Sequence, residues 1–219
     1  MGGFVALFTG GKDSTLSLYR ALQSGYEIKY LVTMISKSPE SYLYHVPNIH
    51  LSKYSSEAIG IPLVIAETSG ISPYEAEDLK KVLSKLDIEG IVVGGVSSRY
   101  QKRIFGDIAA QLNLLVYAPY WNRKHEEFDL GFEIYITAVS SHGLGPDWLG
   151  RKLNYTSLEE LILLSKKFGF NVGGEGGDYE SYVVNGPIFK KRIEFLETEK
   201  IWDGMRGELL IKKVKLVEK

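Results

Sequence analysis

The feature of this sequence that most constrains its fold is the alternation of short apolar runs with helix-like stretches through the first half of the chain. Apolar runs of strand length occupy residues 4–8, 27–35, 61–66, 90–95 and 114–118. Helix-like stretches occupy residues 12–24, 50–60, 73–86 and 98–113. Strands that alternate with helices pair in parallel through right-handed crossovers, and the helices cover both faces of the sheet. The sequence therefore predicts an α/β fold: a doubly wound, Rossmann-like parallel five-stranded sheet.

The place of the first strand in this sheet decides where a ligand would bind. If the first strand is central, the strand order is 3-2-1-4-5, and the first and fourth strands are neighbours at the topological switch point. Ligands of such sheets bind beyond the carboxyl ends of the strands at that point. The turns that follow these two strands contain TGGKDS at 9–14 and GGVSSRYQ at 94–101.

The alternation of apolar runs with helix-like stretches ends near residue 120. Beyond it we expect a helix that is capped by Ser157 and ends near Phe168. The reason is that an acid, Glu160, follows the serine by three residues, as in a capping box. Strand-like segments follow near 181–184, 190–198 and 208–217. The sequence therefore predicts two domains, an α/β domain over 1–120 and a smaller α+β domain over 121–219.

Composition narrows the range of functions. The 219 residues are 44% hydrophobic and 24% charged, which is ordinary for a globular protein. A net charge of −1 gives no field suited to nucleic acid, so no nucleic-acid partner is expected. The absence of cysteine excludes disulfides and chemistry that needs a protein thiol. No signal peptide and no apolar segment of ~20 residues is present, so no membrane association and a cytoplasmic location are expected.

The turn after the first strand has the composition of a phosphate-binding loop. Gly10 and Gly11 let the backbone turn tightly and approach an anion at the start of a helix, whose dipole favours negative charge. Thr9 and Ser14 add hydroxyl donors, and Lys12 adds a positive charge. The loop is not a Walker A motif, because alanine stands at position 6 and an acid at position 13. A strand-to-helix turn with glycines for packing is the simpler alternative.

Two further segments are rich in glycine and polar groups. Gly94 and Gly95 end the fourth strand, and a helix capped by Ser97 or Ser98 follows. Its polar side chains could face a ligand or only solvent: Arg99, Gln101, Lys102 and Arg103. The segment 171–187 contains glycines that cost entropy to order and three acids. These acids could hold Mg²⁺, attract a cation or orient an amine: Glu175, Asp178 and Glu180.

The first loop resembles the SGGKDS signature of the PP-loop ATP pyrophosphatases, with threonine in place of the first serine. Together with the blocks at 95–103, 111–122, 140–153 and 174–179, it resembles the diphthine–ammonia ligase (diphthamide synthase) family over nearly the whole chain. Asp178 stands where that family often has glutamate, and Ser181 where threonine is common. Both residues keep the chemical type.

This resemblance implies an ATP-dependent ligase of diphthamide biosynthesis. Such an enzyme adenylates the carboxylate of diphthine, a modified histidine on translation elongation factor two, and amidates it with ammonium, releasing AMP and pyrophosphate. The implied ATP contacts are Thr9, Gly10, Gly11, Lys12, Ser14, Gly94 and Gly95. Catalysis would involve Lys12, Asp13 and Ser14, with Asp13 orienting the loop or a Mg²⁺ ion.

Substrate contacts are expected in the second and third segments. They are Ser97, Tyr100, Gln101, Arg103, Glu175, Asp178, Tyr179 and Glu180. Diphthine carries a quaternary ammonium, which acids and aromatic rings attract, and Trp121 is a further candidate for this contact. The histidines lack metal-ligand spacing; among them, His142 lies in a motif segment.

Two other functions are open on the sequence alone. A PP-loop tRNA-modifying enzyme is the first, although thiolases of that kind commonly use cysteines, and the chain has none. A regulatory module that binds ATP or AMP without turnover is the second. Such a module would account for the first loop but not for the 171–180 segment, which has no role in simple nucleotide binding. A homodimer is an ordinary expectation for a small enzyme.

Overall fold

The computed structural model describes residues 2–38, 41, 43–44, 47–94, 99–119, 130–174 and 176–219, without the side chains of residues 99 and 100. Its first sheet is parallel and has the order β3-β2-β1-β4-β5, which confirms the predicted fold class and strand order. The strands are β1 (Gly3–Leu7), β2 (Ile28–Ser36), β3 (Leu63–Thr68), β4 (Ile88–Val92) and β5 (Leu115–Tyr117). β1 lies at the centre, where its carboxyl end neighbours that of β4.

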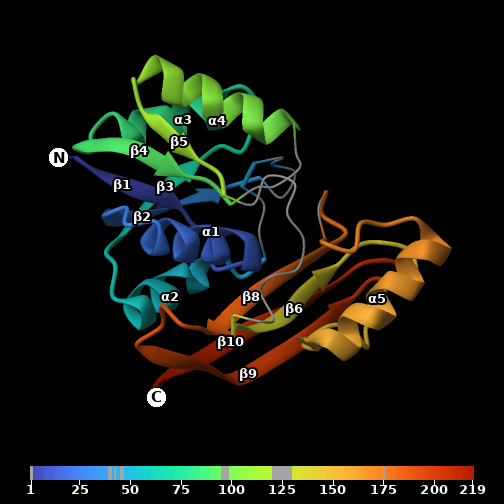
Figure 1. The fold of residues 1–219 in the computed structure, drawn as a ribbon. Coiled ribbons are helices and arrows are strands. Elements are labelled where there is room, and N and C mark those ends of the chain that lie inside the picture. The colour runs from blue at the N-terminus through green and yellow to red at the C-terminus, as the bar shows by residue number, and fades with distance from the viewer. Residues whose placement is uncertain are drawn as a thin grey trace.

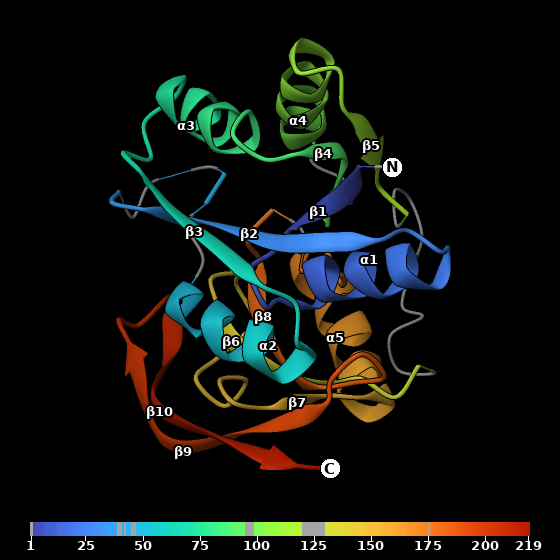
Figure 2. The same ribbon diagram turned by 90° about the vertical axis from the view of Figure 1, so that its left-hand side faces the viewer.

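Helices cover both faces of this sheet (Figures 1 and 2). On the outer face lie α3 (Tyr74–Leu83) and α4 (Arg99–Gln111), and on the other face α1 (Lys12–Gln23) and α2 (Ser52–Ile59), which follows a 3-10 turn at Ile49–Leu51. Successive residues of β1 point to opposite faces: Val5 packs with α3 and α4, while Phe4 and Ala6 pack in the core around α1.

A second, antiparallel sheet lies below α1 in both views. It consists of β6 (Glu133–Val139), β7 (Lys152–Leu153), β8 (Tyr179–Asn185), β9 (Lys191–Trp202) and β10 (Gly207–Glu218). The order is β7-β6-β10-β9, with β8 also paired to β6, and α5 (Tyr155–Phe168) packs beside β7. The sequence predicted β8, β9 and β10 but missed β6 and β7.

Two helix starts expected from the sequence are wrong. Ser72 followed by Pro73 and Glu75 is typical of a helix capped by Ser72, but α3 begins at Tyr74 with Pro73 at the N-cap position and no side-chain cap. α5 is capped by Asn154 rather than by Ser157: Asn154 Oδ1 accepts a 2.9 Å bond from Ser157 N, and Ser157 Oγ accepts a 2.8 Å bond from Asn154 N. Ser157 therefore supplies the second half of a capping box, three residues inside the helix.

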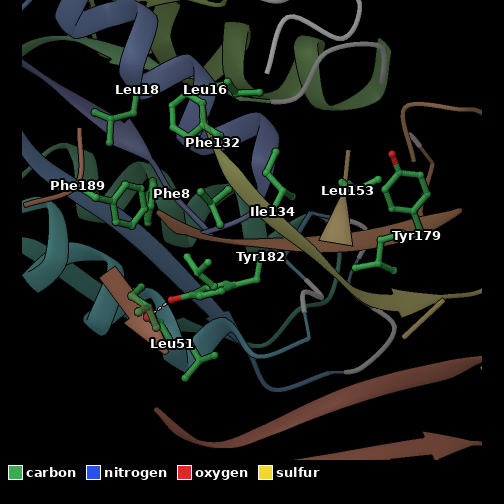
Figure 3. Packing of buried hydrophobic residues seen from close by; sticks show 14 of the residues in the cluster. Phe8, Leu16, Leu18, Leu51, Phe132, Ile134, Leu153, Tyr179, Tyr182 and Phe189 are labelled. Atoms are coloured by element: carbon green, nitrogen blue, oxygen red, sulfur yellow. Dashed lines mark hydrogen bonds between the residues drawn. The ribbon is translucent and has the colours of Figure 1, made fainter. Parts of the chain in front are cut away.

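One apolar core joins the two sheets. Phe8, directly after β1, and Leu16 of α1 pack in the same cluster as Ile134 of β6 and Tyr182 of β8 (Figure 3). The Tyr182 hydroxyl donates a 3.0 Å hydrogen bond to the carbonyl of Leu51. The division into domains 1–120 and 121–219 stays a prediction, since residues 120–129 lie outside the described part. Among the described residues no helix has the length and apolarity needed to cross a membrane.

Candidate active site

The loop between β1 and α1 has the backbone geometry of an anion-binding turn. Gly10 has φ +82°, a conformation that side chains disfavour, and a Cβ there would lie 2.6 Å from the ring of Tyr182. Gly11 occupies the N-cap position of α1, so the residue at that position has no side chain that could bond to the first amides of the helix. The positive end of the α1 dipole therefore opens onto this turn.

The two hydroxyls of the loop hold its shape. Ser14 Oγ donates a 3.1 Å bond to the carbonyl of Gly11 and lies 3.2 Å from Thr9 Oγ1. Thr9 Oγ1 in turn accepts a 3.3 Å bond from the N–H of Gly11. Thr9, Gly11 and Ser14, all predicted to contact ATP, are thus gathered around one turn.

Lys12 is buried at the start of α1. Its side chain is 7% exposed, and Nζ donates to both carboxylate oxygens of Asp13 at 2.8 and 2.7 Å. The same nitrogen lies 5.8 Å from the centre of the Tyr179 ring. Asp13, 44% exposed, therefore orients the charge of Lys12, while its predicted role of orienting the loop or a Mg²⁺ ion stays a prediction.

Strand β8 lies directly against the loop. The N–H of Lys12 donates a 3.2 Å bond to Ser181 Oγ, and the N–H of Val183 donates a 2.9 Å bond to the carbonyl of Gly10. The first and third predicted segments, 9–14 and 171–187, therefore meet. Sequence reasoning noticed Ser181 as a family position but did not predict this contact; its place directly after the acidic block is the signal that could have found it.

Glu180 lies between the two β8 residues that approach Lys12. It is partly buried, and burial raises the pKa of its carboxyl from 4.5 to about 7. The charge of Lys12 acts in the opposite direction, and that of Asp13 raises the pKa further. Glu180 is thus the acid of this segment whose pKa is affected by the charges of the first turn of α1.

Asp178 has both carboxylate oxygens engaged in shaping the glycine-rich loop. One accepts from Ser141 Oγ, and the other accepts a 2.7 Å bond from the N–H of Asn171. Three glycines of this loop have positive φ: Gly174, Gly176 and Gly177. Cβ atoms at Gly176 and Gly177 would meet nothing within 4 Å, so these two glycines serve the backbone conformation.

Tyr179 and Glu175 complete the predicted third segment. The Tyr179 hydroxyl donates a 2.9 Å bond to the carbonyl of Val172, and a Cβ at Gly174 would lie 2.8 Å from the Tyr179 ring. The ring is therefore fixed beside Lys12. Glu175 lies outside the described residues.

The second predicted segment meets the first through Gly94. A Cβ at Gly94 would lie 2.6 Å from both N and Cα of Ser14, so only glycine lets the end of β4 pass against the first turn of α1. Gln101 is partly buried and Arg103 is exposed. The rest of this segment falls outside the description: Gly95, Ser97 and Ser98 entirely, and the side chains of Arg99 and Tyr100.

Metal-binding and histidine positions add little to this site. In the described ranges no group of three or more histidines and acids is arranged to hold a metal ion. The centre of the His142 ring lies 5.0 Å from that of the Phe168 ring. Trp121 lies outside the described residues.

Comparison with known proteins gives the family. The family model of the diphthamide synthase N-terminal domain matches residues 2–115, and that of the C-terminal domain matches residues 122–217. Proteins named diphthine–ammonia ligase are 34% identical over 217 residues in Rattus norvegicus and 33% over 216 in Homo sapiens. Each alignment covers 86% of this chain and 80% of the relative.

The chain is also similar to a solved structure from Methanocaldococcus jannaschii, described as a predicted subunit of tRNA methyltransferase, with 15% sequence identity and a TM-score of 0.48. The alignment covers 85% of this chain and 98% of the solved chain. The two domain models together span nearly the whole sequence, and both belong to one family. The chain therefore belongs to the diphthamide synthase family.

Proposed function

We propose that this chain is an ATP-dependent diphthine–ammonia ligase. It adenylates the carboxylate of diphthine on translation elongation factor two and amidates it with ammonium, giving diphthamide, AMP and pyrophosphate. The observation that carries this proposal is the bond from Lys12 N to Ser181 Oγ, which joins the phosphate loop to the acidic block. Nucleotide chemistry and acceptor chemistry then share one site, as the relatives named diphthine–ammonia ligase require.

The carboxylate must be activated, because direct attack by ammonia would have to expel oxide, which is too poor a leaving group. A carboxylate therefore does not condense with ammonia at neutral pH, whereas an acyl adenylate releases AMP. ATP supplies that adenylyl group when it is bound. The amino end of α1, which begins after Gly11, and the charge of Lys12 stabilise the negative charge that develops on pyrophosphate.

The residues of the loop fit a triphosphate. Gly10 and Gly11 keep side chains away from the turn, and Lys12 is held at its edge by Asp13. A Mg²⁺ ion that accompanies ATP would take most of its ligands from phosphate oxygens and water, because Mg²⁺ needs few protein carboxylates. We place Gly94 with the nucleotide contacts, since it borders Ser14.

Product analysis tests this function. Purified protein is incubated with Mg·ATP and ammonium, with and without elongation factor two that carries diphthine. We expect AMP and pyrophosphate only when the acceptor is present, and no ADP. Elongation factor two without diphthine is the matched control. Cleavage to ADP, or AMP formation that ignores the acceptor, would overturn the assignment.

A further inference from the structure

The aromatic ring of Tyr182, in strand β8, packs against the backbone of the phosphate loop. A Cβ at Gly10 would lie 2.6 Å from Cε2 and 3.1 Å from Cδ2 of this ring. Tyr182 is 2% exposed, so its ring is buried where it meets the loop. The ring therefore forms one wall of the turn at Gly10, the residue whose φ is +82°.

The hydroxyl of Tyr182 fixes the ring from its far end. It donates a 3.0 Å hydrogen bond to the carbonyl of Leu51, where Figure 3 draws the dashed line. A tyrosine hydroxyl has one hydrogen, so Ser55 Oγ is the donor in its 2.7 Å contact with the same hydroxyl. Leu51 ends the 3-10 turn and Ser55 lies in α2, so both elements hold the ring in place.

The backbone of β8 holds the loop from a second direction. The N–H of Val183 donates a 2.9 Å hydrogen bond to the carbonyl of Gly10. A Cβ at Gly11 would lie 3.2 Å from the carbonyl oxygen of Ser181, so this glycine also borders the strand closely. Glycine loses more conformational freedom on ordering than any other residue. The Tyr182 ring and the β8 backbone together therefore order two residues that are flexible by nature.

We propose that Tyr182 is a positioning residue for ATP: its ring holds Gly10 in the left-handed conformation of the phosphate loop and acts on the triphosphate through Gly10. This inference rests on the proposed function and goes beyond it by assigning the residue that preorganises the loop. A loop that is already ordered loses little conformational freedom when it binds a ligand, and this favours a low Kd for ATP. Tyr182 is buried and acts without touching the nucleotide.

Four substitutions separate the effect of the ring from that of the hydroxyl and from a general loss of packing. Tyr182→Met removes the ring but keeps a flexible apolar side chain that fills gaps, and Tyr182→Leu is a second variant of this kind. Tyr182→Phe removes the hydroxyl and keeps the ring against Gly10. Phe105→Met is the matched control, because Phe105 is 7% exposed and belongs to the cluster on the outer face of the first sheet. Circular dichroism shows which variants are folded.

Equilibrium binding of Mg·ATP, measured by calorimetry without the acceptor, reports on the loop directly. We expect Tyr182→Met and Tyr182→Leu to raise the Kd about 10-fold, because a displaced positioning group is costly even far from the reacting atoms. Tyr182→Phe and Phe105→Met should keep the parental Kd. With the diphthine-bearing acceptor, the KM for ATP of Tyr182→Met should rise by more than kcat falls, because saturating ATP restores the turn.

A double-mutant cycle with Gly10→Ala tests whether Tyr182 acts through Gly10. The new methyl meets the ring at 2.6 Å in the parental background, and Tyr182→Met removes that ring. Gly10→Ala should therefore raise the Kd for ATP by a smaller factor in Tyr182→Met than in the parental protein.

A parental Kd in the folded Tyr182→Met or Tyr182→Leu protein would overturn the role of Tyr182. The same follows if Tyr182→Phe raises the Kd as much as Tyr182→Met, or if the factors for Gly10→Ala and Tyr182→Met simply multiply. A parental protein that binds ATP but forms no AMP with the acceptor would instead overturn the proposed function, and the comparison of Kd values would still decide the role of Tyr182.

Discussion

The backbone N–H of Lys12 donates a 3.2 Å hydrogen bond to the hydroxyl of Ser181, a residue 169 positions further along the chain. This bond ties the start of α1 to strand β8, and a second one from Val183 N to the carbonyl of Gly10 runs beside it. The phosphate loop is therefore shaped by the second half of the chain as well as by the first. A change in β8 should reach the loop directly.

Removing the Ser181 hydroxyl should weaken ATP use. Ser181→Ala leaves the Lys12 amide without its acceptor in a buried position, and one lost hydrogen bond of this kind costs about 1 kcal/mol. We expect a higher KM for ATP and a small loss in the free energy of unfolding. Ser181→Thr keeps the hydroxyl and serves as the control. Parental ATP kinetics for Ser181→Ala would show that the bond does not shape the loop.

The charge of Lys12 should carry much of the catalysis. Lys12→Ala removes the cation that Asp13 holds at the loop, and we expect acceptor-dependent AMP formation to fall by roughly 100-fold or more. Lys81→Ala removes an exposed lysine of α3 and should leave the rate unchanged. Rapid-quench measurement of AMP compares them. A Lys12→Ala protein that formed AMP at the parental rate would exclude the assigned role.

Gly94 should tolerate no side chain. In Gly94→Ala the new methyl would meet Ser14 backbone atoms at 2.6 Å, so β4 or the first turn of α1 must shift. Overpacking of this kind typically costs ~1–3 kcal/mol in the free energy of unfolding. Gly106→Ala in α4 is the control, because its Cβ would meet nothing within 4 Å and alanine favours the helix. Equal stability of the two variants in chemical denaturation would contradict the close approach.

The raised pKa of Glu180 should appear in the pH dependence of stability. Between its ordinary value of 4.5 and the folded value of about 7, the folded protein binds more protons at this site than the unfolded chain. The contribution of Glu180 to the free energy of unfolding must then fall as pH rises through that interval. Glu180→Gln should remove this slope, whereas Glu197→Gln should keep it. Denaturation at several pH values gives both slopes, and identical slopes would show that the carboxyl titrates normally.

The first sheet could be predicted because its signals are local and periodic. Five apolar runs and the glycine pair at 10–11 fix the strands and the switch point before any tertiary contact is known. Strand β6 was missed although Gly131, with φ +77°, marks a turn just before it, because the burial of its residues alternates over only part of its length. The cap of α5 was misplaced by three residues because Ser157 also bonds at the helix start.

The site could be predicted only in part, because its decisive contacts join distant residues. Residues 9–14 follow from their own chemistry, and a steric requirement at Gly94 follows from strand order. The bond between Lys12 and Ser181, and the raised pKa of Glu180, depend on how the second sheet packs beneath α1. No spacing in the sequence reports that packing.

Incorporation of labelled nitrogen tests the central claim most directly. Elongation factor two that carries diphthine is incubated with the protein, Mg·ATP and ammonium enriched in the heavy nitrogen isotope, and the acceptor is analysed by peptide mass spectrometry. We predict one labelled nitrogen at the modified histidine for each AMP released. AMP release without label in the acceptor, or label without AMP, would contradict the account.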